Sequence, residues 1–430
     1  MTEGRDVRAV RLAHGPLDAV VDDVPGSKSI ANRALVCAAL ATGTSEFTGV
    51  PDGDDSQALV TALADLGLGI GTNGSTVLID GVDGELPGRP AHLDARLAGT
   101  TSRFLTALCA LSPVPVVVDG APPLRARPMA PLHHALADLG AAVDALDRPG
   151  SLPVRVGGRR PSGGEVALPG DISSQYLTAL MLIGPYLAGG LHIRLTTPLV
   201  SRPYVELTAR VMADFGCSGV AVGDDMVVVG PGRYVGRPYR IEADASSASY
   251  PLAAAAVTGG RVTVAGLGSA SVQGDRVFAD LLARMGCDVR WSTDSITVER
   301  TASLCGIEVD MADISDTVPT LAALAAFADS PTTITGVGFI RAKESDRLGD
   351  LAGELRRAGI EATELPDGIR IAPSTPHAAT FHTHHDHRLA MSLALIGLRT
   401  PGIEIADPAV VTKSWPGYWR MLDVLAGESR

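Results

Sequence analysis

The chain has 430 residues, of which 46% are apolar and 4% aromatic, so it is long enough for two or three compact α/β domains and unlike a disordered or fibrous protein. Its formal net charge of −12 argues against nucleic acid or an anionic membrane as the main partner. An acidic protein that binds an anionic substrate must concentrate its positive charge at one place.

Residues 1–15 alternate charged and apolar side chains and lack the apolar core of a signal peptide. The longest apolar stretch, residues 177–191, is too short to span a bilayer and is interrupted by Pro185. The five cysteines are far apart and form no C-x-x-C pair, which favours reduced, buried thiols. We therefore expect a cytoplasmic protein.

One pattern recurs six times along the chain: a polar loop, an apolar helix, a glycine break and a short β-branched strand. The apolar helices begin near residues 32, 102, 175, 249, 318 and 389, which are 69 to 74 residues apart. Because these helices are apolar on nearly all faces, they must be buried all round. A second, amphipathic helix closed by a glycine precedes strands around residues 70, 143, 220, 289 and 362.

Six such units cannot share one core, so the sequence predicts an α/β (α+β) fold of two domains with three units each. We expect residues 25–242 to form a domain inserted between residues 1–24 and 243–430, which together form the other domain. The N-terminal strand, at residues 7–12, would belong to that second domain. The three buried helices of each domain would lie parallel, clad by sheets, with the active site in the cleft between the domains.

The polar loop before each buried helix collects residues that could bind anions. In chain order these are Lys28, Ser29 and Arg33; Gly99, Thr100, Ser102 and Arg103; Ser173, Ser174 and Gln175; Asp244, Ser246 and Ser247; Asp316 and Thr317; and Asp386, His387 and Arg388. Helix capping explains the Ser, Thr and Asp residues of any single loop about as well. Capping does not require the lysine and arginines, because a cation at a helix N-terminus opposes the macrodipole. Parallel helix N-termini with these cations would surround a small ligand that carries phosphate and carboxylate groups.

Three further segments add charge to this set. Residues 120–129 contain Arg125 and Arg127, residues 340–350 contain Arg341, Lys343, Glu344, Asp346 and Arg347, and residues 410–418 contain Lys413. Because Glu344 lies between Lys343 and Arg347, it would stay ionised and within reach of a substrate, as acid–base chemistry requires. A solvated i,i+3 ion pair accounts for Glu344 and Arg347 almost as well.

Two other motifs are incomplete. G-S-K-S at residues 26–29 resembles a P-loop, but Val21 stands where that motif has its earlier glycine, which argues against nucleotide hydrolysis. Residues 382–387 read H-x-H-x-D-H, as in dinuclear zinc hydrolases, but no histidine follows His387. We therefore expect no metal site and interpret these histidines as a solvated loop.

Taken together, the polar loops resemble those of the 3-phosphoshikimate 1-carboxyvinyltransferases, the EPSP synthases. The resemblance covers almost the whole chain and rests on nine motifs in the family's order: PGSKSIANRAL, LAGTTSRFL, RARPM, SSQYLTAL, SRPY, DASSASYPLAAA, KESDRL, DHRLAM and TKSWP. It implies the enolpyruvyl transferase fold, in which each of two domains has three βαβαββ units. It also implies transfer of the enolpyruvyl group of phosphoenolpyruvate to the 5-hydroxyl of shikimate 3-phosphate, with no cofactor and no metal.

The resemblance further implies roles for individual residues. The shikimate 3-phosphate contacts would be Lys28, Ser29, Arg33, Ser173, Ser174, Gln175, Ser201, Tyr204, Asp316 and Lys343. The phosphoenolpyruvate contacts would be Lys28, Gly99, Arg127, Gln175, Arg347, Arg388 and Lys413. Asp316 and Glu344 would form the acid–base pair, with Lys28 as a further catalytic residue. Leu97 and Phe339 stand where many members have asparagine, and each removes a polar side chain near the acceptor.

We expect small anionic substrates as the only partners, no nucleic acid, no membrane, and a monomer. One alternative is the sister enolpyruvyl transferase that acts on a nucleotide or UDP-sugar. Its mobile loop carries a cysteine, whereas residues 120–127 contain none, although Leu97 and Phe339 keep a nucleotide acceptor open. Another alternative is a non-catalytic anion-binding protein of the same fold. It would be expected to lack Asp316, Glu344 or Lys413, and all three are present.

Overall fold

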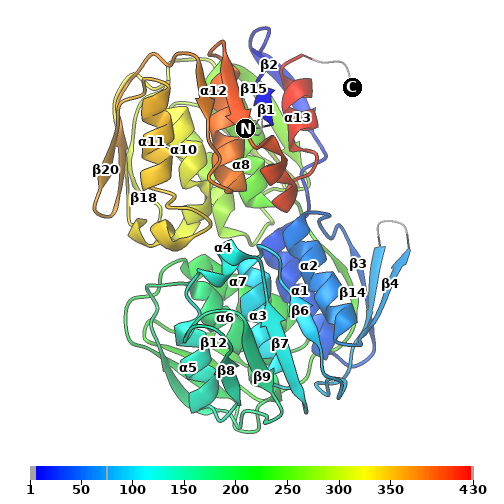
Figure 1. Cartoon of the computed structure of the whole chain (residues 1–430). Coiled ribbons are helices and arrows are strands. Elements are labelled where there is room, and N and C mark those ends of the chain that lie inside the picture. The colour runs from blue at the N-terminus through cyan, green and yellow to red at the C-terminus, as the bar shows by residue number, and fades with distance from the viewer. Residues whose placement is uncertain (1–5, 74–75, 428–430) are drawn as a thin grey trace. The chain divides into compact units, whose positions relative to one another are not determined.

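The structure, a computed structural model, describes residues 6–73 and 76–427 (Figure 1). The chain divides into two compact units. Unit 1 comprises Met1–Pro25 and Glu242–Arg430, and unit 2 comprises Gly26–Ile241. Among the described residues, each unit contains three sheets, and each sheet combines one parallel strand pair with antiparallel pairing; five sheets have four strands and one has three. The expected α/β fold of repeated βαβαββ elements is thereby confirmed.

Unit 2 holds the first three repeats. Its sheets have the strand orders β14-β3-β5-β4, β6-β7-β9-β8 and β10-β11-β13-β12. The strands are β3 (Thr44–Thr48), β4 (Gly69–Asn73), β5 (Thr76–Asp80), β6 (His92–Asp94), β7 (Pro115–Asp119), β8 (Val143–Ala145), β9 (Val154–Gly157), β10 (Gly164–Leu168), β11 (Leu191–Leu195), β12 (Val220–Val222), β13 (Met226–Val229) and β14 (Pro238–Arg240). The helices are α1 (Lys28–Leu40), α2 (Asp54–Asp65), α3 (Gly99–Cys109), α4 (Pro122–Arg125), α5 (Ala130–Asp138), α6 (Ser174–Ile183), η1 (Gly184–Tyr186) and α7 (Arg202–Asp214).

The first helix of each repeat in unit 2, namely α1, α3 and α6, is buried over nearly its whole length, as its apolar sequence predicts. Hydrogen bonds join their N-terminal halves. Asn32 of α1 donates to Thr101 of α3 (3.5 Å), and Arg33 of α1 donates to Thr178 of α6 (3.4 Å). Because residues near the same end of each helix meet, the three N-termini lie at one side of the unit.

Unit 1 holds the other three repeats. Its sheets have the strand orders β16-β17-β15-β2, β18-β19-β21-β20 and β1-β23-β22. The strands are β1 (Val7–Ala9), β2 (Leu17–Val21), β15 (Gly260–Ala265), β16 (Asp288–Trp291), β17 (Ser295–Arg300), β18 (Glu308–Asp310), β19 (Thr332–Thr335), β20 (Ala362–Leu365), β21 (Gly368–Ile371), β22 (Ala379–Phe381) and β23 (Ile403–Ala406). The helices are α8 (Ala245–Thr258), η2 (Gly274–Val277), α9 (Phe278–Arg284), η3 (Ala312–Thr317), α10 (Val318–Ala325), η4 (Gly338–Ala342), α11 (Gly349–Arg357), α12 (His387–Gly397), η5 (Pro408–Lys413) and α13 (Tyr418–Leu425).

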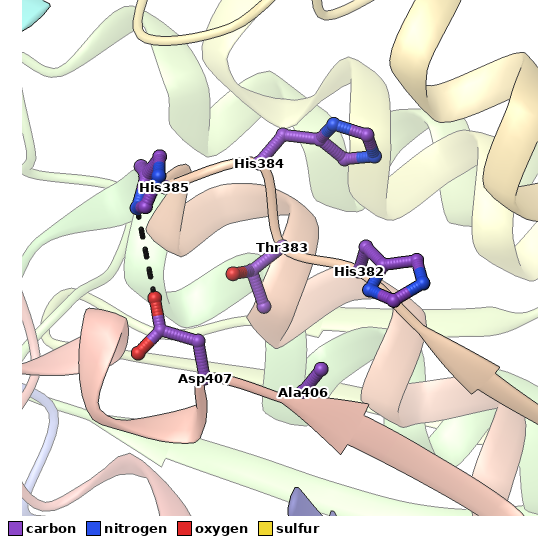
Figure 2. A pocket seen from close by; sticks show the side chains of 6 residues that line it. All are labelled: His382, Thr383, His384, His385, Ala406 and Asp407. Atoms are coloured by element: carbon purple, nitrogen blue, oxygen red, sulfur yellow. Dashed lines mark ion pairs between the residues drawn. The ribbon is translucent and has the colours of Figure 1, made fainter. Parts of the chain in front are cut away.

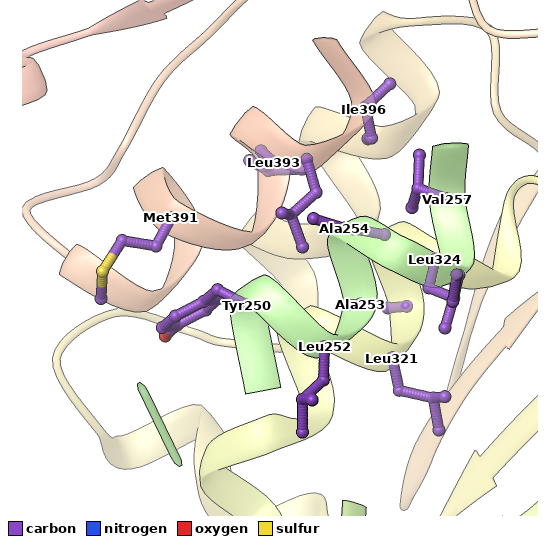
Figure 3. Packing of buried hydrophobic residues seen from close by; sticks show 14 of the residues in the cluster. Tyr250, Leu252, Ala253, Ala254, Val257, Leu321, Leu324, Met391, Leu393 and Ile396 are labelled. Atoms are coloured by element: carbon purple, nitrogen blue, oxygen red, sulfur yellow. The ribbon is translucent and has the colours of Figure 1, made fainter. Parts of the chain in front are cut away.

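The buried helices of unit 1 are α8, α10 and α12, and their side chains pack on one another (Figure 3). Ala253 and Ala254 of α8 are fully buried, and their small side chains allow close approach of the neighbouring helices. A chain of hydroxyl contacts crosses the three helices, from Ser249 to Thr320 (3.1 Å) and from Thr320 to Ser392 (3.3 Å). All three hydroxyls lie in the N-terminal or middle turns, so these helices also run parallel.

In the part of the chain that the structure describes, no helix combines the length and the apolar character needed to cross a membrane.

Candidate active site

In unit 2, Lys28 is the first residue of α1 and forms an ion pair with Asp55, with 3.0 Å between Nζ and Oδ2. Asp55 lies in the first turn of α2 and is buried. The carboxylate places the ammonium group at a helix N-terminus, where the macrodipole alone would repel it. Sequence analysis did not identify Asp55, because an acidic residue in a first helical turn is ordinary and its partner lies 27 residues away.

Arg33 is buried and binds protein oxygens rather than facing outwards. Its Nη1 donates to the carbonyl oxygen of Ser29 (2.8 Å), its Nη2 to the carbonyl oxygen of Tyr204 (3.1 Å), and its Nε to the hydroxyl of Thr208 (2.8 Å). Burial lowers the pKa of Arg33 to about 10, so the group is still charged at neutral pH. Arg33 therefore connects the N-terminal turn of α1 with that of α7 and fixes the positions of Ser29 and Tyr204.

Arg103 has a comparable role at α3. Its Nη1 donates to the carbonyl oxygen of Gly99 (2.8 Å), its Nη2 to that of Pro128 (3.2 Å), and its guanidinium lies over the ring of Tyr176 at 5.2 Å. These contacts join α3, α6 and the segment that carries Arg127. Arg33 and Arg103 thus each bind a carbonyl four residues earlier in their own helix. An anion is not the only partner that a cation near these N-termini can have.

Gly99 is the first residue of α3 and lies directly against two guanidinium groups. A Cβ built on Gly99 would lie 2.5 Å from Nη1 of Arg127 and 2.8 Å from Nη1 of Arg103. No side chain fits there unless an arginine moves, so the close approach requires glycine. The structure thereby brings together Gly99 and Arg127, two of the residues that the family resemblance assigns to phosphoenolpyruvate.

The remaining candidates of unit 2 lie at the N-termini of α6 and α7. Ser173 is the N-cap of α6, where its hydroxyl accepts from the backbone N–H of Gln175 (3.3 Å). Ser201 is the N-cap of α7 and adopts a left-handed conformation with φ of 55°. Ser174 follows Ser173 as the first residue of α6, and Tyr204 lies in the first turn of α7. These positions fit both the capping interpretation and an anion-binding one, because a helix N-terminus offers free N–H groups in either case.

In unit 1, Arg347 is the centre of a buried ion-pair network and is itself 1% exposed. Its Nη1 binds Oδ1 of Asp316 (3.0 Å), its Nη2 binds Oε2 of Glu344 (2.7 Å), and its Nε binds Oδ2 of Asp386 (2.6 Å). Burial works against the charge, but the three carboxylates outweigh it and raise the pKa of Arg347 above its ordinary value. One guanidinium therefore holds both carboxylates of the expected acid–base pair.

Three more cations complete this network, which we call the Arg347 cluster. Arg388 binds Oδ2 of Asp316 (2.6 Å), Lys413 binds Oε1 of Glu344 (3.2 Å), and the Lys343 ammonium group lies 3.9 Å from Oδ1 of Asp316. The cluster contains four cations (Lys343, Arg347, Arg388 and Lys413) and three carboxylates (Asp316, Glu344 and Asp386). Its formal charge is thus +1, in a chain whose overall charge is −12. The cluster is therefore slightly positive within an acidic chain, which suits a small anionic ligand.

Asp386 has two functions in this cluster, and sequence analysis gave it only the first. It is the N-cap of α12, where its carboxylate accepts from the backbone N–H of Arg388 (2.9 Å). The same carboxylate binds Arg347 and accepts from the hydroxyl of Ser345 (3.2 Å). Asp386 therefore orients Arg347 through Nε and also contacts Nη2 (3.3 Å), the nitrogen that binds Glu344.

A second buried carboxyl group, Asp275, lies near Asp316 in the turn η2, which packs against η3 and α8. Its Oδ2 is in close contact with the hydroxyl of Ser246 in the first turn of α8. Burial raises the pKa of Asp275 to about 7, with a smaller contribution from the Asp316 charge, while Ser246 and Arg388 oppose this rise. Asp275 was not identified from the sequence, because a single Asp in a polar turn carries no distinguishing pattern.

The histidine-rich loop lines an open cavity of about 490 Å³ together with Ala406 and Asp407 (Figure 2). The His384 ring contacts Glu354 (3.0 Å) and Asp350 (3.5 Å) of α11. The His385 ring lies on the other side of the loop from the His384 ring and contacts Asp407 (3.7 Å) (Figure 2). Within residues 6–73 and 76–427, no three His, Cys, Asp or Glu side chains are grouped to hold a metal ion. The H-x-H-x-D-H pattern is thus divided between this cavity and the Arg347 cluster, to which its aspartate belongs.

The two departures from the family pattern differ in their surroundings. Leu97 is 37% exposed and lies just before α3. Phe339 in η4 is partly buried against the core of unit 1, and the ammonium group of Lys343 lies over its ring, 5.9 Å from the centroid. The chain contains only three lysines, Lys28, Lys343 and Lys413, and all three belong to the expected substrate contacts.

Comparison with known proteins shows the same similarity along nearly the whole chain. The family model described as "EPSP synthase (3-phosphoshikimate 1-carboxyvinyltransferase)" matches residues 13–422. A 3-phosphoshikimate 1-carboxyvinyltransferase of Methanoculleus marisnigri is 44% identical over 412 residues, covering 95% of this chain and 97% of the relative. A 3-phosphoshikimate 1-carboxyvinyltransferase of Nostoc punctiforme is 42% identical over 417 residues, covering 96% of this chain and 98% of the relative.

Solved structures agree with the sequence comparisons. The structure of EPSP synthase from Acinetobacter baumannii superimposes with a TM-score of 0.82 at 28% identity, covering 98% of both chains. With the βαβαββ repeats and the grouped candidate residues, these matches show that the chain belongs to the EPSP synthase (3-phosphoshikimate 1-carboxyvinyltransferase) family.

Proposed function

We propose that the protein transfers the enolpyruvyl group of phosphoenolpyruvate to the 5-hydroxyl of shikimate 3-phosphate and releases inorganic phosphate. The observation that carries this proposal is the Arg347 guanidinium, which binds Asp316 on one terminal nitrogen and Glu344 on the other. Two carboxylates held this close can act on two atoms of one reacting pair, namely the acceptor hydroxyl and the methylene carbon of phosphoenolpyruvate.

In the addition step, Asp316 accepts the proton of the 5-hydroxyl, and the oxygen of that hydroxyl attacks C2 of phosphoenolpyruvate. Glu344 delivers a proton to C3, which turns the methylene group into a methyl group and gives a tetrahedral adduct. In the elimination step, Glu344 takes a proton back from this methyl group as the C2–O bond to phosphate breaks, and Asp316 passes the proton of the 5-hydroxyl to the departing phosphate. The cations of the Arg347 cluster stabilise the negative charge that develops on the phosphate.

Before addition, Glu344 must acquire the proton that it delivers. In the structure its carboxylate binds two cations, Arg347 at 2.7 Å and Lys413 at 3.2 Å, and such contacts favour the ionised form. A phosphate or carboxylate group that binds Arg347 and Lys413 competes for the same N–H donors. Substrate binding would thereby weaken both ion pairs and make protonation of Glu344 easier.

The candidate residues of unit 2 are proposed to bind the same two substrates. Lys28, held by Asp55, would contact both, and Arg127 beside Gly99 would contact phosphoenolpyruvate. Ser173, Ser174, Ser201 and Tyr204 at the N-termini of α6 and α7 would contact shikimate 3-phosphate, together with Ser29, Arg33 and Gln175.

We also propose a cytoplasmic monomer whose partners are its small anionic substrates. All five cysteines are free thiols, which suits a reducing compartment. The net charge of −12 disfavours nucleic acid as a partner.

The test is a phosphate-release assay with phosphoenolpyruvate and shikimate 3-phosphate. A UDP-sugar and UMP serve as alternative acceptors, which the names of the relatives do not favour. Glu344→Gln should lower kcat by roughly 10²- to 10⁴-fold with little change in KM, because glutamine keeps the shape of the side chain but cannot deliver a proton to C3. Glu364→Gln is the matched control, since Glu364 binds Arg341 outside the Arg347 cluster. Faster turnover with a UDP-sugar, or normal turnover of Glu344→Gln, would refute the proposal.

A further inference from the structure

We infer that Phe339 is a positioning residue for the acceptor substrate: its ring holds the Lys343 ammonium group in place beside Asp316. This inference rests on the proposed function, in which Lys343 contacts shikimate 3-phosphate. The face of a phenyl ring carries negative electrostatic potential and attracts a cation within about 6 Å of its centroid. The Lys343 ammonium group lies 5.9 Å from the Phe339 centroid, which is within that range.

The ring of Phe339 is itself fixed by its surroundings. It belongs to η4, whose backbone is anchored at Gly338, where the N–H donates to Oδ1 of Asp367 (2.8 Å). The next residue, Ile340, is fully buried in the core of unit 1. Arg341 at the end of η4 binds both carboxylate oxygens of Asp346 (3.1 and 3.0 Å). A ring on such a short, anchored segment can determine where a flexible lysine comes to rest.

The Arg347 cluster explains why Lys343 needs this contact. Asp316 already binds Arg347 at 3.0 Å and Arg388 at 2.6 Å, whereas Lys343 is 3.9 Å away. Two arginines therefore neutralise the carboxylate, and their charges repel a third cation. The aromatic face attracts the Lys343 ammonium group without adding a further negative charge.

The side-chain amide of an asparagine can donate and accept hydrogen bonds, whereas the phenyl ring of Phe339 offers only its aromatic face. We therefore infer that the acceptor is recognised here through the Lys343 charge, and that Phe339 acts on the substrate only through Lys343. Replacing the ring should then weaken binding of the acceptor and leave phosphoenolpyruvate unaffected.

The experiment compares Phe339→Leu, which removes the ring, with Phe339→Tyr, which keeps it. We expect Phe339→Leu to raise KM for shikimate 3-phosphate about two- to fivefold, with kcat and the KM for phosphoenolpyruvate unchanged. Phe339→Tyr should keep the KM for shikimate 3-phosphate at its wild-type value, because the aromatic ring is retained. The matched control is Phe327→Leu, because the Phe327 ring also contacts a cation, Arg399, at 5.2 Å. Phe327 follows the C-terminal end of α10, whereas Asp316 precedes the N-terminal end of that helix, so the control lies at the other end of α10 from Asp316. This control should leave both KM values unchanged.

A double-mutant cycle separates this role from a merely structural one. In a Lys343→Met background, Phe339→Leu should produce no further increase in KM, because the cation that the ring holds is gone. An equal increase in both backgrounds, equal KM values for the Leu and Tyr variants, or a parallel increase in the KM for phosphoenolpyruvate would each overturn the inference.

A readout that does not depend on turnover keeps this inference separate from the proposed function. Since the chain has three lysines, selective ¹³C labelling of lysine gives three resolvable ε-CH₂ environments. The ring current of Phe339 should shift the Lys343 signal upfield, and Phe339→Leu should abolish that shift. If the wild-type protein released no phosphate with shikimate 3-phosphate but showed the shift, the proposed function alone would fail. If it turned over and showed no shift, the Phe339 inference alone would fail.

Discussion

Replacing Gly99 by alanine tests the proposed phosphoenolpyruvate contacts of unit 2, because Gly99 leaves room for two guanidinium groups. The new Cβ would lie 2.5 Å from Nη1 of Arg127 and 2.8 Å from Nη1 of Arg103. Arg103 is held by the carbonyl oxygens of Gly99 and Pro128 and by the Tyr176 ring, so it cannot move far. Arg127 is therefore the side chain expected to shift.

The size of the shift follows from the contact distance. Ordinary van der Waals contact with a Cβ begins at 3.4 Å, so the Arg127 guanidinium must retreat by about 1 Å. A displacement of this size in a group that positions substrate can lower the rate by up to about 10²-fold. Overpacking costs roughly 1–3 kcal/mol, and the flexible end of Arg127 places Gly99→Ala near the lower limit. The expected decrease in Tm is then about 2–4 °C.

Steady-state kinetics with phosphoenolpyruvate and with glyphosate as inhibitor measures the effect. Glyphosate resembles phosphoenolpyruvate but is longer, so it should compete with this substrate and tolerate the displaced Arg127 less well. Gly99→Ala should raise the inhibition constant of glyphosate more than the KM for phosphoenolpyruvate. The control is Gly353→Ala in α11, where nothing lies within 4 Å of a new Cβ, and which should leave both constants unchanged.

Two results would refute this reasoning. One is a wild-type enzyme that glyphosate does not inhibit at concentrations well above the KM for phosphoenolpyruvate. The other is a Gly99→Ala variant in which both constants match those of the wild type, because Arg127 would then have moved without any effect on either ligand.

Three further variants test residues that the structure adds to the site. Asp55→Asn removes the carboxylate that holds the Lys28 ammonium group, so KM for both substrates should rise about tenfold, the equivalent of a charged hydrogen bond of roughly 1.5 kcal/mol; unchanged KM values would contradict this. Asp386→Asn weakens a buried ion pair of Arg347, so calorimetry should show a Tm lowered by several degrees and kinetics a lower kcat/KM. Asp275 keeps its proton up to about pH 7 when folded but ionises near 3.8 when unfolded, so its contribution to stability declines as pH rises from 4 to 7. The Tm of Asp275→Asn relative to wild type should therefore increase between pH 5 and pH 8, and a constant difference would contradict the assignment.

The helices and the fold class could be predicted because both depend on local patterns. A helix such as α8, with the run Leu252 to Val257 apolar on every face, has no stable alternative to burial. The glycine that follows each amphipathic helix marks its end, since Gly67, Gly140, Gly216, Gly286 and Gly359 all adopt positive φ. The regular spacing of these patterns predicts six repeats, and six repeats of this length predict two domains of three repeats each.

The partners of the site residues could not be predicted, because they lie far apart in sequence. The pairs Arg347–Asp386 and Arg388–Asp316 are separated by 39 and 72 positions, and nothing local distinguishes these partners from other acidic residues. Arg33 shows the same limit from the other direction. Its position predicts an anion as its partner, and this stays a prediction. The oxygens of Ser29, Tyr204 and Thr208 that it also binds could not be predicted, because the packing of α1 against α7 brings Tyr204 and Thr208 close.

The different roles of lysine and arginine among the candidate residues follow from the chemistry of their side chains. The buried arginines use their planar donors to bind several oxygens in fixed directions, as Arg347 does with three carboxylates. Each lysine instead places a compact charge on a flexible stem close to a carboxylate: Lys28 near Asp55, Lys343 near Asp316 and Lys413 near Glu344. A group of this kind can turn toward substrate oxygens without breaking a bidentate geometry. The arginines therefore fix the geometry around them within each unit, and we expect the three lysines to be the cations that reorient most readily toward an anionic ligand.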